Sequence, residues 1–139
     1  MLTPVQLDPD GVSAADRRDR RLVLIVDDCA DTRTLYSEYL DLAGFAVKEA
    51  SDGIGAFDAA AAALPDVVVM DLGLPGMDGR DVLRQLKADP RTRAIPVVVV
   101  SGYPPSATPS DSAPWQAYVL KPCVPEDLID TIGRVLPSR

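Results

Sequence analysis

The sequence predicts an α/β fold built on a doubly wound parallel sheet of five strands. From Leu22 onward, short apolar runs alternate with longer segments of helical character. The strongest runs are apolar and β-branched without interruption, which is typical of strands buried on both faces of a sheet. The alternation indicates a parallel sheet covered by helices. Right-handed crossovers then restrict the topology to the doubly wound type.

Five segments are expected as strands. The continuous apolar runs 22–26, 67–70 and 97–100 give the strongest signals. Residues 45–50 and 118–120 are weaker strands of the same kind.

Four segments between or after these runs are expected as helices. Leu35, Tyr39 and Leu42 form an apolar stripe at i, i+4 and i+7, and Gly44 follows as a stop signal. Residues 56–64 are nearly all alanine and are ended by Pro65. The last two helices have apolar stripes, one begun by Asp78-Gly79 and one by Pro125: Val82, Leu83 and Leu86, then Leu128, Ile132 and Leu136.

Composition excludes several classes of function. A chain of 139 residues is the usual size of one domain, and we expect a disordered leader over residues 1–20 and a domain over 21–137. The net charge of −7 argues against a nucleic-acid-binding face. The sequence has no histidine, which excludes a histidine-based triad or a phosphohistidine donor. With no signal peptide and no membrane-spanning run, we expect a cytoplasmic protein that does not contact membranes.

Four of the five expected strands end in a polar side chain. The first is followed by Asp27-Asp28, the third by Asp71, the fourth by Ser101 and the fifth by Lys121. Because ligands of doubly wound sheets bind at the carboxyl ends of the strands, these side chains should converge at one edge.

Three carboxylates at one edge of a sheet repel one another. At an effective dielectric constant near 20, each pair about 4 Å apart costs about 4 kcal/mol, against a domain stability of about 5–15 kcal/mol. Lys121 supplies one positive charge, and a divalent cation would supply the rest; an oxygen-rich site of this kind suits Mg²⁺. A carboxylate beside a metal ion and a lysine can attack a phosphoryl group.

The motifs carry a resemblance to a known family. They are, in chain order, IVDD at 25–28, MDLGLPGMDG at 70–79, VSG at 100–102 and YVLKP at 118–122. This set resembles the receiver domains of two-component response regulators over about residues 21–137. The resemblance implies a flavodoxin-like fold with strand order 2-1-3-4-5. It also implies that the domain catalyses its own phosphorylation and dephosphorylation without a separate substrate, so it is not an enzyme in the ordinary sense.

The resemblance also assigns roles to single residues. Asp71 would accept the phosphoryl group and, with Asp27, Asp28 and the backbone carbonyl of Gly73, hold Mg²⁺; Asp28 would be a direct ligand and Asp27 would act mainly through water. Ser101 and Lys121 would contact the phosphoryl group. Tyr118 matches an aromatic switch position that follows the movement of Ser101, although a packed strand aromatic explains it equally well.

One segment departs from the family pattern. Residues 103–115 contain four prolines and little helical periodicity, which predicts a shortened or irregular fourth helix. Trp115 is either packed under this loop or exposed as an anchor for a partner. The segment is the one support for an alternative, a pseudo-receiver that keeps the fold without being phosphorylated.

Partners follow from the leading interpretation. A histidine kinase or a histidine phosphotransfer protein would act upstream, and an unknown protein target downstream. Two enzyme or ligand-binding alternatives are disfavoured. A haloacid-dehalogenase-type hydrolase would need Asp-x-Asp after the first strand, and a flavodoxin-like binder would need a phosphate loop there; the chain has Asp27-Asp28-Cys29-Ala30.

Overall fold

A computed structural model describes residues 20–74, 78–103 and 115–137. All strand pairs are parallel, and the five strands lie in the order β2-β1-β3-β4-β5. The doubly wound sheet and its strand order are therefore confirmed. The strands are β1 (Leu22–Val26), β2 (Ala46–Ala50), β3 (Val67–Asp71), β4 (Val97–Ser101) and β5 (Ala117–Leu120). The helices of the described ranges are α2 (Ala30–Leu42), α3 (Gly53–Ala63), α4 (Gly79–Ala88) and α5 (Pro125–Val135).

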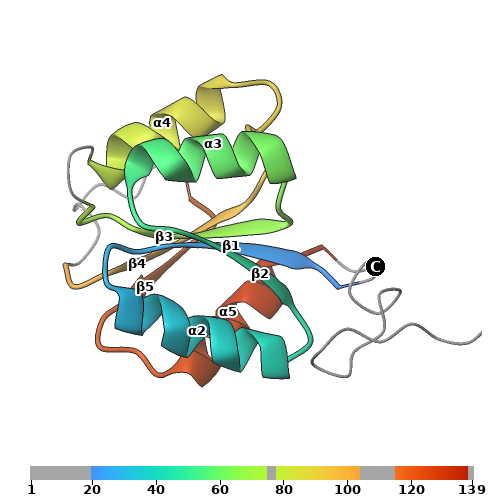
Figure 1. The fold of residues 1–139 in the computed structure, drawn as a ribbon, viewed down its shortest axis with the longest axis vertical. Coiled ribbons are helices and arrows are strands. Elements are labelled where there is room, and N and C mark those ends of the chain that lie inside the picture. The colour runs from blue at the N-terminus through green and yellow to red at the C-terminus, as the bar shows by residue number, and fades with distance from the viewer. Residues whose placement is uncertain (1–19, 75–77, 104–114, 138–139) are drawn as a thin grey trace, which may run out of the picture.

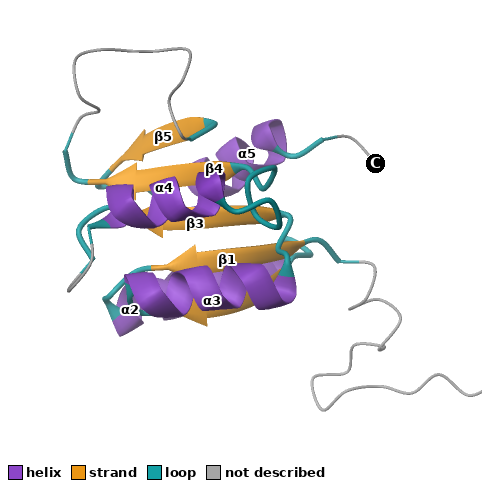
Figure 2. Cartoon of the chain, turned by 90° about the horizontal axis from the view of Figure 1, so that it is seen from above, coloured by secondary structure: helices purple, strands orange, loops and turns teal. Residues whose placement is uncertain are grey.

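The sheet is the middle of three layers. Helices α3 and α4 cover one face, and α2 and α5 cover the other (Figure 1). Seen from above, α3 runs along β1 while α4 runs along β3 and β4 (Figure 2). The chain passes from β1 to β2 on one side and then returns to β3 on the other side of β1. This reversal is the switch point at which such sheets bind ligands.

Alternation along each strand divides the core in two. Successive side chains of a strand point to opposite faces, so Leu24 and Val26 pack toward α3 and α4 while Val23 and Ile25 pack toward α2 and α5. Every residue of β4 is buried, as the uninterrupted valine run predicts. A sheet that is apolar on both faces holds its strand ends rigidly, which is what a site at those ends requires.

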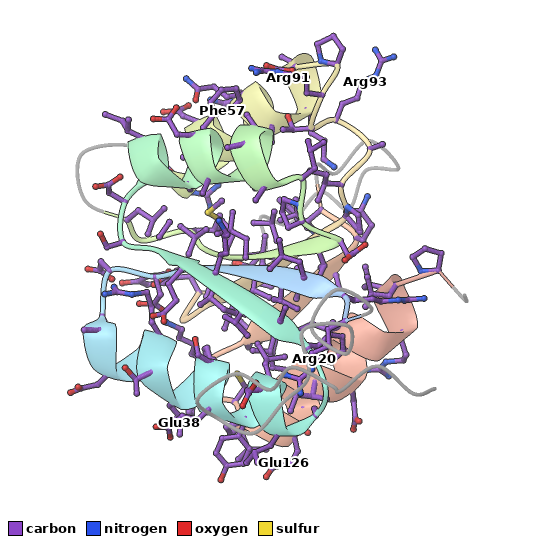
Figure 3. The ribbon with its side chains drawn as sticks, turned by 45° about the vertical axis from the view of Figure 1, so that its right-hand side comes forward. Arg20, Glu38, Phe57, Arg91, Arg93 and Glu126 are labelled. Carbon is purple, nitrogen blue, oxygen red and sulfur yellow. The ribbon has the colours of Figure 1, made fainter. Side chains whose placement is uncertain are left out.

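Helix α2 corrects one expectation. The helix forms where predicted, but the stripe of Leu35, Tyr39 and Leu42 is not its buried face. Tyr36 and Leu40 face the core, and Leu40 is 0% exposed whereas Leu42 is 84% exposed. Glu38 projects from the side of α2 that lies away from the sheet (Figure 3). Tyr36 and Leu40 also have helical spacing, so periodicity alone does not show which face of α2 is buried. The buried face is determined by the contacts of α2 with the sheet and with α5.

The other helices follow the sequence closely. Helix α3 begins at Gly53, before the alanine run, because Asp52 caps it by accepting a hydrogen bond from the Gly55 N–H at 2.7 Å. Asp78 caps α4 in the same way through the Arg80 N–H. Pro125 occupies the start of α5. The predicted stripes of α4 and α5 are buried.

Two expectations lie mostly outside the described residues. Of the expected leader over residues 1–20, the structure describes only Arg20. Of the irregular helix expected between β4 and β5, at residues 103–115, it describes only the two end residues. Within the described ranges, no helix combines the length and apolar character needed to span a bilayer.

Candidate functional site

Three carboxylates meet where β1 and β3 end. Asp27 and Asp28 follow the last residue of β1, and Asp71 is the last residue of β3. One oxygen from each carboxylate lies within 4.8 Å of the others. Asp27 is buried and Asp28 is exposed. The loops that lead away from these strand ends lie together at the left of Figure 1. The fold thus brings together the three acids that were expected to converge because each follows or ends a strand.

Lys121 lies directly beside two of these acids. It follows β5, and its backbone N–H donates to the Ser101 carbonyl at 2.7 Å, which ties the loop to the end of β4. Its Nζ lies 3.2 Å from Asp27 Oδ2 and 3.3 Å from Asp71 Oδ2. Burial lowers the pKa of Lys121, but the negative charges of Asp27 and Asp71 outweigh that effect and hold the pKa above its usual value. The side chain is therefore a permanent cation at neutral pH.

Backbone N–H groups fix the other carboxylate oxygens. Asp71 Oδ1 accepts a hydrogen bond from the Gly73 N–H at 2.9 Å, and Asp27 Oδ1 accepts one from the Cys29 N–H at 2.9 Å. Gly73 was expected to offer its carbonyl to a metal ion. Its N–H contact with Asp71 is an additional role, and the carbonyl role stays a prediction.

The charge and donor set of the cluster fit Mg²⁺. Three carboxylates and one ammonium leave two negative charges unbalanced among these four side chains. All the available ligand atoms are oxygens, which a hard divalent cation prefers, and the exposure of Asp28 leaves room for metal-bound water. Receiver domains in general bind Mg²⁺ through an acidic cluster of this kind.

Ser101 connects the site to aromatic residues at the edge of the sheet. It ends β4 and is buried, and its Oγ accepts a hydrogen bond from the Tyr103 N–H at 3.2 Å. The Tyr118 hydroxyl in turn donates to the Tyr103 carbonyl at 2.6 Å. The rings of Trp115 and Tyr118 meet edge to face, with their centroids 5.4 Å apart. Trp115 is half-buried and packs against the core.

A pocket of about 350 Å³ opens beside these residues. Asp71, Gly73 and Ser101 lie on its wall, and the exposed Arg80 and Tyr103 line it as well. A small molecule can therefore reach the Asp71 carboxylate from solvent.

A family model described as the response regulator receiver domain matches residues 23–133. The chain belongs to this family. Protein PilH of Pseudomonas aeruginosa is 33% identical over 120 residues, which cover 82% of this chain and 96% of PilH. The solved structure of the chemotaxis response regulator CheY4 of Vibrio cholerae superimposes with a TM-score of 0.75 at 28% identity, covering 84% of this chain and 99% of CheY4.

Some relatives of this receiver are much longer proteins. Response regulator PleD of Caulobacter vibrioides is 43% identical over 79 residues, but that region is 57% of this chain and only 17% of PleD. The similarity is therefore to a small part of PleD, and this chain spans much less than two thirds of the length of that relative.

Two residues near the receiver's site were given no role there from the sequence, although Gly79 is the last residue of the 70–79 motif. Gly79 begins α4 against the end of β3, and a Cβ there would lie 2.9 Å from the Asp71 carbonyl oxygen and 2.7 Å from Leu72 Cα. A side chain at position 79 would thus push on the backbone that carries Asp71. The Asp78-Gly79 pair signals a helix start but not this close approach. The second residue is Arg33, which contacts the backbone of Asp27.

Proposed function

We propose that this receiver accepts a phosphoryl group on Asp71 in a Mg²⁺-dependent reaction, and that phosphorylation switches a surface that binds another protein. The observation that carries the proposal is the position of Lys121 Nζ, which bridges Asp27 and Asp71 beside the third carboxylate. Lys121 lies between the buried Asp27 and the more accessible Asp71, and this contact orients the Asp71 carboxylate for attack on a phosphorus atom.

The chemical step uses this chain's own carboxylate as the nucleophile. An oxygen of Asp71 attacks the phosphorus of a phosphohistidine, the P–N bond breaks, and its electron pair leaves with the imidazole. The Gly73 N–H and Lys121 hold Asp71 in position, which supplies most of the rate when a reaction depends on orientation. Asp27, Asp28, Asp71 and the Gly73 carbonyl would hold Mg²⁺, which would supply positive charge to the transferring oxygens.

Ser101 and Lys121 then stabilise the phosphoryl group. Lys121 pairs with one phosphoryl oxygen, and the Ser101 hydroxyl donates a hydrogen bond to another. When Ser101 turns toward the phosphoryl group, the Tyr103 N–H loses its acceptor and the Tyr103 carbonyl can release Tyr118. The domain thereby switches itself and has no separate substrate.

Receiver domains as a family interact with kinases and phosphotransfer proteins. For this chain we propose a histidine kinase or a histidine phosphotransfer protein upstream and a protein target downstream, in the cytoplasm. An acidic chain with a net charge of −7 is a poor partner for nucleic acid.

The test is the intact mass of the protein after incubation with phosphoramidate, with and without Mg²⁺. We expect a Mg²⁺-dependent gain of one phosphoryl group in the wild type and in Asp58→Asn, a matched change of an exposed aspartate on α3. Asp71→Asn should gain none. A folded wild type that gains no phosphoryl group would favour the pseudo-receiver, an interaction module that is not phosphorylated.

A further inference from the structure

Arg33 lies behind the carboxylate cluster, in the first part of α2. Its side chain is only 18% exposed. Its Nη1 donates to the backbone carbonyl of Asp27 at 2.7 Å, and its Nε donates to Glu49 Oε1 on β2 at 3.2 Å. One guanidinium therefore joins the start of α2, the end of β1 and the neighbouring strand.

The contact with Asp27 acts on the backbone rather than on the carboxylate. A peptide group is planar, so holding the Asp27 carbonyl also fixes the N–H and Cα of the next residue, Asp28. The Asp27 N–H is held as well, because it donates to the Ala50 carbonyl at 3.2 Å. The direction in which the chain leaves β1 is thus set by Arg33 and by β2 together.

Asp28 is the acid that needs this support. The Asp27 carboxylate has its own partners in Cys29 and Lys121, and Asp71 has Gly73 and Lys121. Asp28 is exposed, and among the described residues its carboxylate has no hydrogen bond or ion pair of its own. Its position therefore depends on the backbone that carries it.

We propose that Arg33 is a positioning residue for the divalent cation: it orients the peptide between Asp27 and Asp28 so that the Asp28 carboxylate faces the other two acids. This inference rests on the proposed Mg²⁺-dependent function. Groups that orient metal ligands from outside the coordination sphere typically change metal affinity by about 10- to 100-fold when they are removed.

Two physical effects of Arg33 predict opposite results. As a nearby positive charge, Arg33 repels Mg²⁺, so removing the charge should tighten binding. As a positioning residue, it preorganises the ligands, so removing it should weaken binding. The sign of the change in affinity therefore separates the two accounts.

The experiment is a titration of the protein with MgCl₂ at constant ionic strength, followed by amide chemical shifts in NMR. Arg33→Met keeps the apolar stem and removes both donors, and we expect the apparent Kd for Mg²⁺ to rise about tenfold. Arg33→Lys keeps the charge but cannot serve both acceptors, and its Kd should rise at least about threefold.

Arg20→Met is the matched control. Arg20 is similarly exposed at 20%, and its Nη1 also bonds an acid, Asp41 of α2, at 2.9 Å. Asp41 lies in the last turn of α2, whereas the carboxylate cluster lies next to the first. The Kd of this control should stay within about twofold of the wild type.

Phosphorylation gives a second measurement. If Arg33 acts through metal binding, the slower phosphorylation of Arg33→Met by phosphoramidate should recover when Mg²⁺ is raised to saturation. A deficit that persists at saturation would contradict a role in metal positioning.

The outcomes separate the two proposals. A wild type that binds Mg²⁺, with Arg33→Met binding it equally or more tightly, overturns the role of Arg33 alone. If Arg33→Met is unfolded by circular dichroism, Arg33→Lys decides, and wild-type affinity in that variant overturns the role. A wild type that binds no Mg²⁺ overturns the proposed function and the role of Arg33 together.

Discussion

Asp28 differs from the other two acids of the cluster in the contacts of its carboxylate. Asp27 and Asp71 both pair with Lys121, and each accepts a hydrogen bond from a backbone N–H of its own. Within the described part of the chain, the Asp28 carboxylate has no such partner and adds negative charge. It therefore contributes repulsion to the folded state until a cation binds. If Asp28 is a metal ligand, as proposed, function and stability oppose each other at this residue.

Asp28→Asn tests this opposition. Without metal, the substitution removes repulsion at nearly constant shape, so we expect the Tm in EDTA to rise by roughly 2–5 °C. With Mg²⁺, the wild type should gain stability by mass action while Asp28→Asn gains much less. Thermal unfolding followed by circular dichroism, with Asp58→Asn as the control, measures both effects. A lower Tm for Asp28→Asn in EDTA would contradict the repulsion argument.

The predictability of the site differs from residue to residue. Asp27, Asp28, Asp71, Ser101 and Lys121 could be selected from sequence because each follows an apolar run, and parallel strands place their carboxyl ends at one edge. Arg33 and Gly79 could not be selected that way. Their contacts with the site are with backbone atoms of Asp27, Asp71 and Leu72, and a contact with the backbone leaves no pattern of residue types in the sequence.

Helix α2 shows that prediction from the sequence is limited for a whole element as well. Its existence followed from periodicity, but residues 35, 36, 39, 40 and 42 are all apolar, so more than one face could have been the buried one. The phase of the helix is set by its contacts with the sheet and α5, which involve residues far away in sequence. Tyr36 and Leu40 are buried as a result, and Leu42 is left in solvent.

Leu40→Ala and Leu42→Ala form a matched pair that tests this phase. Leu40 is fully buried, so its truncation should lower the free energy of unfolding by about 2–5 kcal/mol. Leu42 is mostly exposed, and its truncation should change that free energy by no more than about 0.5 kcal/mol. Urea denaturation of the two variants measures the difference. Equal losses would mean that both faces of α2 are covered.

At the scale of the whole molecule, a chain of contacts joins the site to the far edge of the sheet. Ser101 contacts the Tyr103 N–H, the Tyr103 carbonyl holds Tyr118, and Tyr118 packs on Trp115. Because β5 is the last strand of the sheet, this aromatic pair lies at the edge of the sheet. A change at Ser101 thus has a physical route to the surface.

The fluorescence of Trp115 should report this route. Trp115 is the only tryptophan, so its signal is unambiguous. If phosphorylation draws Ser101 inward and frees Tyr118, the edge-to-face contact is lost and the emission spectrum should shift when phosphoramidate and Mg²⁺ are added. Asp71→Asn should show no shift, and Tyr118→Leu should show a much smaller one. A wild type that is phosphorylated by mass but keeps its emission unchanged would contradict the switch role of Tyr118.

The pairing of Lys121 with Asp27 spans 94 positions of the sequence, and this separation has a consequence for biosynthesis. At about 5–20 residues per second, a ribosome adds Asp27 roughly 5–20 s before Lys121. In the later part of that interval, once Asp71 has been added, the nascent chain carries all three acids but lacks the lysine that offsets part of their charge. Repulsion among these acids therefore disfavours closure of this edge of the sheet until β5 and Lys121 have been synthesised.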